Sequence, residues 1–271
     1  MEKTRLDVLL HERGLAPSRE RARAMIMAGL VQVDGMRVDK PGSRVSPDSR
    51  LTVTGADRPF VSRGGLKLER AVRAFGVDFA GKTVLDVGAS TGGFTDCALQ
   101  HGAARVIALD VGYGQLDWKL RSDPRVEVRE RTNIRYVRPE DLGRRVDLVT
   151  IDVSFISLEK VLPVVAALLV PGGEVVALVK PQFEAGRNRV GKRGVVRDAA
   201  VHREVLERVM QAARAAGFVV LGLTHSPIKG PEGNIEYLLH LGLDLPEARP
   251  APDIGRVVDE AAAELGGMAC E

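Results

Sequence analysis

The sequence contains very little cysteine. Of its 271 residues only Cys97 and Cys270 are cysteines, one inside a helical pattern and one next to the end. Two thiols placed in this way form neither a disulfide framework nor a cluster of metal ligands. The sequence therefore argues against a disulfide scaffold and gives no indication of a metal site.

Long apolar runs are also absent. The longest wholly apolar stretch, "VLPVVAALLV" from Val161 to Val170, is well short of the roughly 20 residues that a membrane span needs. We expect it to form a buried helix with Pro163 in its first turn. The first ten residues, "MEKTRLDVLL", lack the extended apolar core of a secretory signal. A cytoplasmic protein is therefore expected.

The formal charge of +3 is unevenly distributed. Residues 1–60 hold 11 Lys and Arg against 8 Asp and Glu, whereas residues 61–271 hold 28 of each kind. A small basic module ahead of a larger neutral one indicates that the first part binds a polyanion. The 45% hydrophobic content is sufficient for a folded core.

The first fifty residues are typical of two helices followed by short strands. Leucines at helical spacing in residues 6–10 predict the first helix, and Ser18 is placed to cap a second, "SRERARAMIMAG". Two alternating runs, "LVQVDG" and "RLTV", follow, with Asp34 and Gly35 in a tight turn. This order resembles the small RNA-binding domain of ribosomal protein S four. The resemblance implies contacts to RNA phosphates by Arg19, Arg21 and Arg23.

Strand and helix patterns alternate after a linker rich in Gly, Pro and polar residues. This alternation predicts a mostly parallel sheet with helices on both faces. The last two strand patterns are separated only by "KGPEG", which is too short for a crossover helix, so they should form an antiparallel hairpin at or near one edge. We expect domains at 1–57 and 66–242, a linker at 58–65, and a C-terminal spacer with a short helix at 243–271.

The stretch "TVLDVGASTGGFTD" predicts a strand, a glycine-rich turn and a helix. It lacks the GxGxxG spacing of dinucleotide oxidoreductases and the lysine of GxxxxGK phosphate loops, so a nucleotide without a pyrophosphate fits better. It resembles the first motif of class I methyltransferases, which implies S-adenosyl-L-methionine as cofactor. The next strand ends at an acid, 22 residues after the first loop glycine, where open-sheet nucleotide folds bind ribose hydroxyls. The candidate cofactor residues are Asp86 for the amino group, Gly88, Ala89, Ser90, Gly92 and Gly93 in the loop, Asp110 for the ribose and Asn133 for the adenine.

The apolar strand pattern "EVVALVKP" ends on Lys180. Because the carboxyl ends of parallel strands open onto one crevice, we expect Lys180 to lie beside the cofactor loop, near Asp152 at the end of the preceding strand. With Lys67 in the helix before the sheet and Glu236 in "GNIEYLL", they resemble the catalytic tetrad of FtsJ-like ribose 2′-hydroxyl methyltransferases. A ribose hydroxyl is a very weak acid, so its methylation benefits from a proton acceptor and from positive charge near the developing alkoxide. Lys180 is our candidate for that base or alkoxide stabiliser, with Asp152 and Glu236 orienting the lysines and the ribose.

From residue 5 to about 242 the chain resembles the TlyA family, also called hemolysin A, notably in "RPFVSRGGLKL" and "LVKPQFE". The resemblance implies 2′-O-methylation of cytidines in ribosomal RNA. It also implies a Rossmann-like class I methyltransferase fold, with a mostly parallel seven-stranded sheet whose last strand is antiparallel, joined to a small α+β RNA-binding domain. The loop "FEAGRNRVGKRGVVRD" supplies further candidate RNA contacts at Arg187, Arg189, Lys192, Arg193 and Arg197.

Two other classes of function remain open at this point. One is a non-catalytic RNA-binding factor in ribosome assembly, against which the complete cofactor loop and tetrad argue. The other is the membrane-lytic protein that the name hemolysin suggests, against which the lack of a membrane-inserting stretch argues. The expected partners are ribosomal RNA or ribosomal subunits, with no membrane and no obligatory protein partner.

Overall fold

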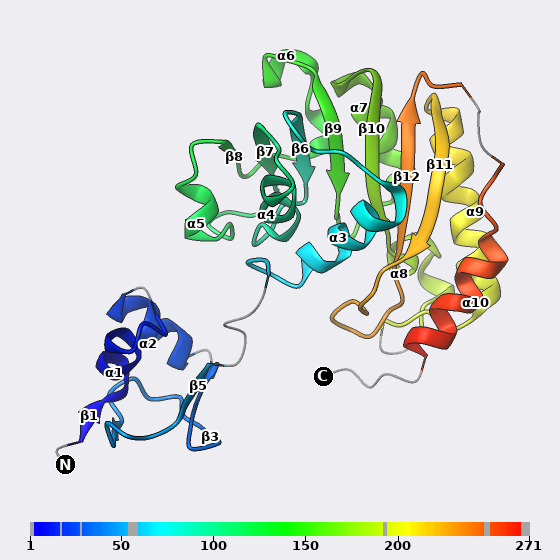
Figure 1. The fold of residues 1–271 in the computed structure, drawn as a ribbon. Coiled ribbons are helices and arrows are strands. Elements are labelled where there is room, and N and C mark those ends of the chain that lie inside the picture. Colours follow the sequence, from blue (N-terminus) through cyan, green and yellow to red (C-terminus); the bar gives the residue numbers. More distant parts are fainter. Residues whose placement is uncertain are drawn as a thin grey trace. The chain divides into compact units, whose positions relative to one another are not determined.

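The chain forms two structural units in the computed structural model, Met1–Pro59 and Phe60–Glu271 (Figure 1). The structure describes residues 3–16, 18–27, 29–53, 59–191, 194–246 and 250–266. The division falls inside the segment that the sequence suggests as a linker.

The described residues of the first unit form two helices and five short strands. These are β1 (Thr4–Arg5), α1 (Leu6–Glu12), α2 (Arg19–Met27), β2 (Val31–Val33), β3 (Met36–Arg37), β4 (Arg44–Val45) and β5 (Leu51–Val53). The cap of α2 is as predicted, because the Ser18 hydroxyl accepts a hydrogen bond from the Arg21 amide at 3.1 Å. Asp34 and Gly35 have φ angles of +52° and +85° and connect the antiparallel strands β2 and β3. The short pair of β1 and β4 was not predicted.

The second unit contains a mostly parallel sheet, as the alternating pattern predicted, with the seven strands that the family resemblance implies. Its strand order is β11-β12-β10-β9-β6-β7-β8. The last strand, β12, runs antiparallel to both of its neighbours, and the pairs among β10, β9, β6, β7 and β8 are parallel. The strand bounds are β6 (Thr83–Val87), β7 (Arg105–Leu109), β8 (Val126–Arg129), β9 (Val146–Ile151), β10 (Leu169–Val179), β11 (Phe218–His225) and β12 (Tyr237–Leu243).

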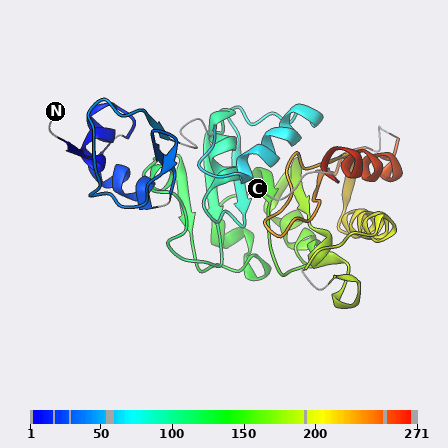
Figure 2. The ribbon, with the colours of Figure 1, turned by 90° about the horizontal axis from the view of Figure 1, so that it is seen from below.

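Helices cover both faces of this sheet. The described helices of the second unit are α3 (Gly64–Phe75), α4 (Gly93–Gln100), α5 (Trp118–Arg121), α6 (Pro139–Leu142), α7 (Leu162–Leu168), α8 (Pro181–Glu184), α9 (Ala199–Ala215) and α10 (Ile254–Leu265), with 3-10 turns η1 (Ile134–Tyr136), η2 (Leu158–Lys160) and η3 (Arg187–Arg189). Helix α3 (cyan) and helix α9 (yellow) lie on opposite sides of the sheet (Figure 2).

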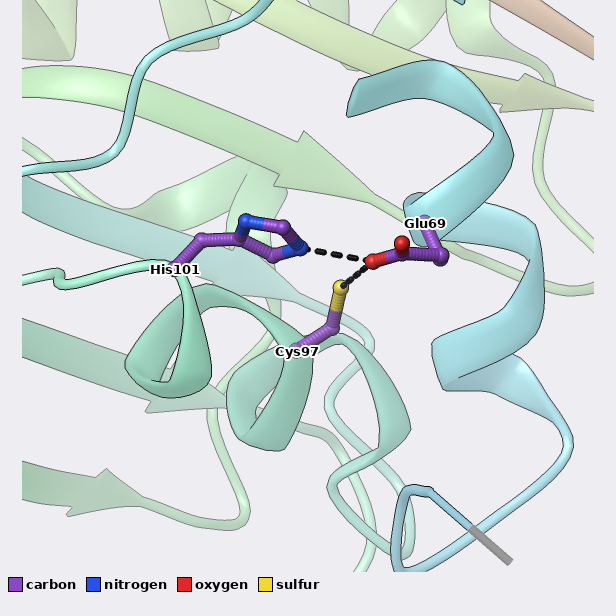
Figure 3. Close-up of side chains that lie close together, drawn as sticks. All are labelled: Glu69, Cys97 and His101. Atoms are coloured by element: carbon purple, nitrogen blue, oxygen red, sulfur yellow. Dashed lines mark hydrogen bonds and ion pairs between the residues drawn. The ribbon is translucent and has the colours of Figure 1, made fainter. Parts of the chain in front are cut away.

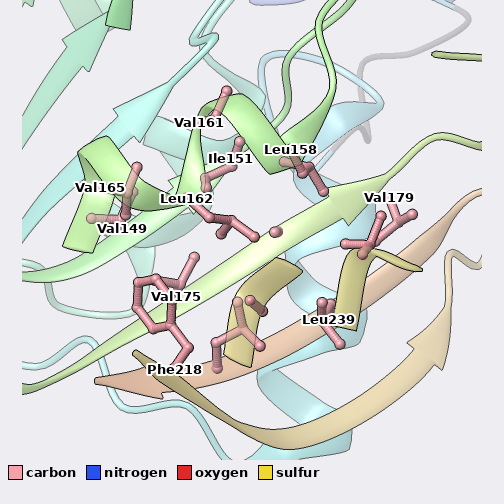
Figure 4. Packing of buried hydrophobic residues seen from close by; sticks show 14 of the residues in the cluster. Val149, Ile151, Leu158, Val161, Leu162, Val165, Val175, Val179, Phe218 and Leu239 are labelled. Atoms are coloured by element: carbon pink, nitrogen blue, oxygen red, sulfur yellow. The ribbon is translucent and has the colours of Figure 1, made fainter. Parts of the chain in front are cut away.

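The two faces of the sheet bury two apolar clusters. One includes Val149, Ile151 and Leu239 of the strands with Val165 of α7 (Figure 4). The other joins α3 and α4 to the opposite face, with Leu68 and Cys97 fully buried. Because strands β6, β9 and β10 are covered on both faces, their sequences are almost continuously apolar. Among the described helices, none has the length and apolarity required to cross a bilayer.

Two element boundaries differ from the sequence predictions. The apolar stretch 161–170 is helical only through Leu168, and Leu169 already pairs with Val146 of β9. Helix α3 begins at Gly64, inside the expected linker. The short helix expected at the C-terminal end is α10, which packs on α9 and β11 as part of the second unit, with Val257, Val258, Ala261 and Leu265 buried.

Candidate active site

The glycine-rich loop between β6 and α4 forms one wall of a cavity of about 770 Å³. Gly88 begins the loop with a φ of +85°, and a Cβ at this position would lie 2.4 Å from the carbonyl oxygen of Asp152. Its amide donates to the carbonyl of Leu109 at 2.8 Å. The loop therefore starts in the narrow space between the ends of β7 and β9, where only glycine fits.

Other small residues of the loop lie behind this wall. The loop residues that line the cavity are Gly88 and Ser90, whereas Ala89, Gly92 and Gly93 are not part of its lining. A Cβ on Gly92 would meet Leu120 Cδ1 at 2.2 Å, and a Cβ on Gly93 would meet Ser62 Oγ at 2.3 Å. The sequence predicts that these glycines let the chain approach a ligand. In the structure, the lack of a side chain at Gly92 and Gly93 lets α4 pack closely against its protein neighbours.

Asp110, at the end of β7, lines the same cavity. Its Oδ2 accepts a hydrogen bond from the Ser90 amide at 2.8 Å, and its Oδ1 accepts one from the Gly112 amide at 2.6 Å. Each carboxylate oxygen can accept more than one hydrogen bond, so the group can still bind hydroxyls. Asn133 also lines the cavity, and its side chain caps η1 by accepting from the Arg135 amide at 3.1 Å.

Asp86, in contrast, is fully buried. The Thr95 hydroxyl donates to its Oδ2 at 2.6 Å and the Thr150 hydroxyl to its Oδ1 at 2.9 Å. Burial raises the pKa of this carboxyl to about 6, because the charged form is poorly solvated in the interior. The sequence predicts that Asp86 contacts the cofactor. The structure instead places its carboxyl between β6, α4 and β9, where it links these elements.

The four residues of the expected tetrad form two ion pairs. Lys180 Nζ lies 2.6 Å from Asp152 Oδ1, and the two side chains are 11% and 20% exposed. Lys67 Nζ lies 2.6 Å from Glu236 Oε2, and both of these side chains are buried. Gln182 donates to Glu236 Oε1 at 3.4 Å and thereby links the second pair to the segment that follows Lys180. Each ammonium group thus has a carboxylate partner.

A second cavity, of about 920 Å³, adjoins the first. Lys180 and Glu236 line this second cavity, whereas Asp152 lines the first. Ser154, Phe155 and Phe183 line both. The Lys180–Asp152 pair therefore stands at the junction of the two cavities.

Phe155 has an unusual conformation at this junction. Its side chain is 90% exposed and its φ is +64°, a region that residues with a Cβ seldom occupy. Its ring packs at a tilt on Phe183, with 4.8 Å between the ring centroids. Backbone strain of this kind clusters at functional sites. The two rings provide an aromatic surface on which another planar ring can stack.

Glu184 fixes the segment that carries Phe155. Its carboxylate accepts hydrogen bonds from the Leu158 amide at 2.8 Å and the Ser157 hydroxyl at 2.7 Å. Burial raises the pKa of this carboxyl. The contacts join α8, which follows Lys180, to the segment that follows Asp152.

The basic loop after α8 is anchored close to Glu236. Asn234 is buried, accepts from the Val196 amide at 3.0 Å and donates to the Gly194 carbonyl at 2.9 Å. Of the candidate RNA contacts in this loop, Arg189 forms an ion pair with Glu204. Lys192 and Arg193 lie outside the described residues, as does the side chain of Arg187.

The arginines of α2 are exposed and surround a buried acid. Arg19 and Arg23 approach Asp7 Oδ2 at 3.5 Å and 3.9 Å, and Arg5 binds the same carboxylate at 2.9 Å. The Arg5 guanidinium holds the pKa of Asp7 below its usual range. Arg21 is also exposed. Part of the positive charge that the sequence suggests for RNA is therefore used to hold α1 against α2.

Several residues of the two cavities were missed by sequence reasoning. Val111 and Ile134 provide apolar lining to the first cavity, and Gln182 donates a hydrogen bond to Glu236 of the second ion pair. Val111 directly follows Asp110, and Ile134 directly follows Asn133. Their position next to a predicted cofactor contact could have identified them from the sequence. Phe155 and Phe183 had no such signal, because exposure and φ are not visible in a sequence.

Two family models match the chain. The model described as FtsJ-like methyltransferase matches residues 60–243, and the model described as S4 domain matches residues 4–51. The two matches lie one on each side of the division between the structural units.

Relatives and solved structures extend this similarity over nearly the whole chain. The chain is 55% identical to YqxC of Bacillus subtilis strain 168, over 96% of this chain and 94% of that protein. It is 47% identical to the 16S/23S rRNA (cytidine-2′-O)-methyltransferase TlyA of Mycobacterium tuberculosis, over 97% of this chain and 98% of that protein. A solved structure described as a hemolysin from Streptococcus thermophilus is 48% identical and superposes with a TM-score of 0.75, covering 98% of both chains.

Proposed function

The chain belongs to the FtsJ-like methyltransferase family, and from this premise we propose that it transfers a methyl group from S-adenosyl-L-methionine to the 2′-hydroxyl of cytidine in ribosomal RNA. The observation that carries the proposal is the Lys180–Asp152 ion pair at the junction of two cavities, one suited to a cofactor and the other to a nucleoside.

The first cavity fits S-adenosyl-L-methionine. Asp110 offers a carboxylate to ribose hydroxyls, and Val111 and Ile134 offer apolar surface to an adenine. The crowded backbone at Gly88 requires a glycine. The loop therefore has no side chain at this position, where the rest of the cofactor would lie. When bound, this cofactor supplies an electrophilic methyl group on a sulfonium sulfur.

The second cavity fits the nucleoside that accepts the methyl group. Lys180 would hold the 2′-hydroxyl by hydrogen bonding and stabilise the negative charge that develops on its oxygen, while Asp152 keeps the ammonium group in position. The hydroxyl proton leaves as the O–C bond forms and the methyl–sulfur bond breaks. Lys180 accepts that proton only in its neutral amine form; as an ammonium group it stabilises the oxygen while the proton passes to solvent. Phe155 and Phe183 would stack on the base of an unpaired nucleotide.

The choice of cytidine in ribosomal RNA draws on the Mycobacterium tuberculosis relative, whose name specifies that nucleotide and both 16S and 23S rRNA. The S4 domain match in the first unit supports an RNA substrate, and we propose that Arg19, Arg21 and Arg23 contact its phosphates. Arg187, Arg189, Lys192 and Arg193 are proposed to do so near the reacting ribose.

The test is transfer of labelled methyl from S-adenosyl-L-methionine to ribosomal RNA and to ribosomal subunits that lack the modification. The wild type is compared with Lys180→Ala, and the product is mapped by sequencing that detects 2′-O-methyl groups. Lys82→Ala is the matched control, because Lys82 also pairs with a carboxylate, Glu174, but stands at the amino end of β6.

We expect transfer to cytidine ribose by the wild type and the control, and a loss of at least about 100-fold in Lys180→Ala, in the range that removal of an acid–base group costs. If the wild type binds the cofactor and transfers no methyl group to any RNA or subunit, the proposal is wrong. The chain would then be a non-catalytic RNA-binding factor.

A further inference from the structure

Three potential metal ligands converge between α3 and α4, on the face of the sheet that these two helices cover (Figure 3). Glu69 Oε2 lies 2.6 Å from His101 Nε2 and 4.0 Å from Cys97 Sγ. The three ligand atoms all lie within 4.8 Å of one another. The oxygen, nitrogen and sulfur atoms thus face one small volume.

The surroundings of this cluster resemble those of a metal site. His101 caps the end of α4 and follows Cys97 by four residues, so about one helical turn brings both side chains to the same side. Glu69 comes from the neighbouring helix, and its other oxygen, Oε1, accepts a hydrogen bond from Arg73 at 2.7 Å. Such an outer partner orients a carboxylate ligand. Cys97 is fully buried, whereas the His101 side chain is 33% exposed and leaves a path for an ion and a water ligand.

The distances are close to those of tetrahedral zinc. Zinc bonds of about 2.0–2.3 Å to O, N and S place ligand atoms about 3.3–3.6 Å apart. The present separations of 2.6 Å and 4.0 Å bracket that range. The shorter separation, between Glu69 Oε2 and His101 Nε2, is a hydrogen bond. A zinc ion would replace the proton of this bond and move the histidine ring away from the carboxylate. The thiol would need to approach by about half an ångström to reach the zinc range.

We propose that Glu69, Cys97 and His101 bind one Zn²⁺ ion, with water as the fourth ligand. One carboxylate, one thiolate and one imidazole are ligands typical of Zn²⁺ and are unsuited to Mg²⁺ or Ca²⁺, which prefer oxygen. On binding, the Cys97 thiol loses its proton to solvent and the sulfur–zinc bond replaces the S–H bond.

The ion would hold together two elements that position the active site. Helix α3 carries Lys67 of the buried ion pair, and α4 follows directly from the glycine-rich loop. A zinc ion shared by the two helices would stabilise the second unit and keep Lys67 in register with the cofactor loop. Because it binds the folded state only, it would raise the melting temperature in proportion to the logarithm of its free concentration.

The experiment measures binding of Zn²⁺ to the untagged, metal-free full chain by competition with a chromophoric chelator. Substitution with Co²⁺ provides an independent readout, because a cobalt–thiolate bond gives a charge-transfer band in the near ultraviolet. The variants are His101→Ala and Cys97→Ser. Cys270→Ser is the control, because Cys270 is the only other thiol in the chain.

We expect one Zn²⁺ per chain, a cobalt–thiolate band and a rise in melting temperature with added zinc in the wild type and in Cys270→Ser. His101→Ala removes a direct ligand. Its affinity for Zn²⁺ should therefore fall by more than the 10–100-fold that is lost when a residue that only hydrogen-bonds to a metal ligand is removed. This variant tests the proposal even if the buried Cys97→Ser variant fails to fold. Binding that is weaker than the chelator can detect, or binding that survives in His101→Ala, would show that the cluster is only an ion pair beside a buried thiol.

Discussion

The Lys67–Glu236 pair is the most deeply buried ion pair of the active site, with side chains 9% and 1% exposed. Removing one partner leaves an unpaired charge in the interior, which costs about 3–5 kcal/mol. We therefore predict that Glu236→Ala lowers the free energy of unfolding by this amount in urea denaturation.

The exposed pair of Arg256 and Glu260 provides the comparison, with side chains 65% and 44% exposed. Glu260→Ala should change the unfolding free energy by no more than about 0.5 kcal/mol. The double variant Lys67→Met with Glu236→Leu should recover much of the loss, because it removes both charges. Equal costs for Glu236→Ala and Glu260→Ala would contradict the burial argument.

Asp86 makes stability depend on pH in a direction opposite to that of most carboxylates. Its pKa is about 6 in the folded chain and 3.8 without the fold, so the folded state binds its proton more tightly. The stability this group contributes is full below pH 3.8 and is lost as the pH rises through 6. A shift of this size corresponds to about 3 kcal/mol.

We predict that Asp86→Asn, which cannot titrate, gains stability relative to the wild type as the pH rises from about 4 to about 6.5. The measurement is thermal or urea unfolding at several pH values. Asp123→Asn is the control, because the Arg125 hydrogen bond lowers the pKa of Asp123 from 3.8. Its contribution to stability is lost only as the pH falls below that value, so its difference from wild type should stay nearly constant over this pH range. A difference between Asp86→Asn and wild type that does not vary with pH would mean that the folded-state pKa of Asp86 is not raised.

At the scale of elements, the loop between β6 and α4 depends on Gly88. A side chain here faces both a φ of +85° and a carbonyl oxygen at 2.4 Å. Gly76, which ends α3, has a φ of +70° and nothing within 4 Å of the position of a Cβ. Comparing alanine substitutions at the two glycines therefore separates the cost of backbone strain from the cost of steric overlap.

We predict that Gly76→Ala costs about 1 kcal/mol, from backbone strain alone. Gly88→Ala should cost several times more and should weaken S-adenosyl-L-methionine binding, because the loop must move away from β9. Melting temperatures and cofactor titration by calorimetry measure both effects. If both variants bind cofactor like the wild type, Gly88 does not shape the site.

The pattern of strands and helices could be predicted because it depends on local periodicity. The capped start of α2, the parallel strands and the antiparallel hairpin at the edge all have short-range signals. The junction of α7 and β10 was predicted wrongly, since a continuous apolar run such as 161–170 is compatible with a buried helix and with a buried strand. Pairing of Leu169 with Val146 of β9 decides the matter, and that pairing is a long-range contact.

At the scale of the whole molecule, we predict separate roles for the two units. The chain shortened to residues 60–271 retains the two large apolar clusters and both cavities, so it should bind S-adenosyl-L-methionine like the full chain. Its affinity for RNA should fall and should depend less steeply on salt, because the phosphate contacts proposed for α2 are lost. Filter binding of ribosomal RNA at several salt concentrations tests this. An unchanged salt slope would place the main RNA contacts in the second unit.

The sequence by itself determined the order of elements, the glycine-rich loop and the positions of Lys180 and Asp152 at strand ends, because parallel strands of an open sheet must end at one edge. Only the tertiary structure decided which charges pair, that Asp86 is buried, that Phe155 is exposed and that Glu69, Cys97 and His101 converge. Each of these depends on side chains from segments far apart in the chain, such as Lys67 and Glu236, 169 residues apart. Local sequence patterns carry no information about which of many compatible partners a side chain meets across such a separation.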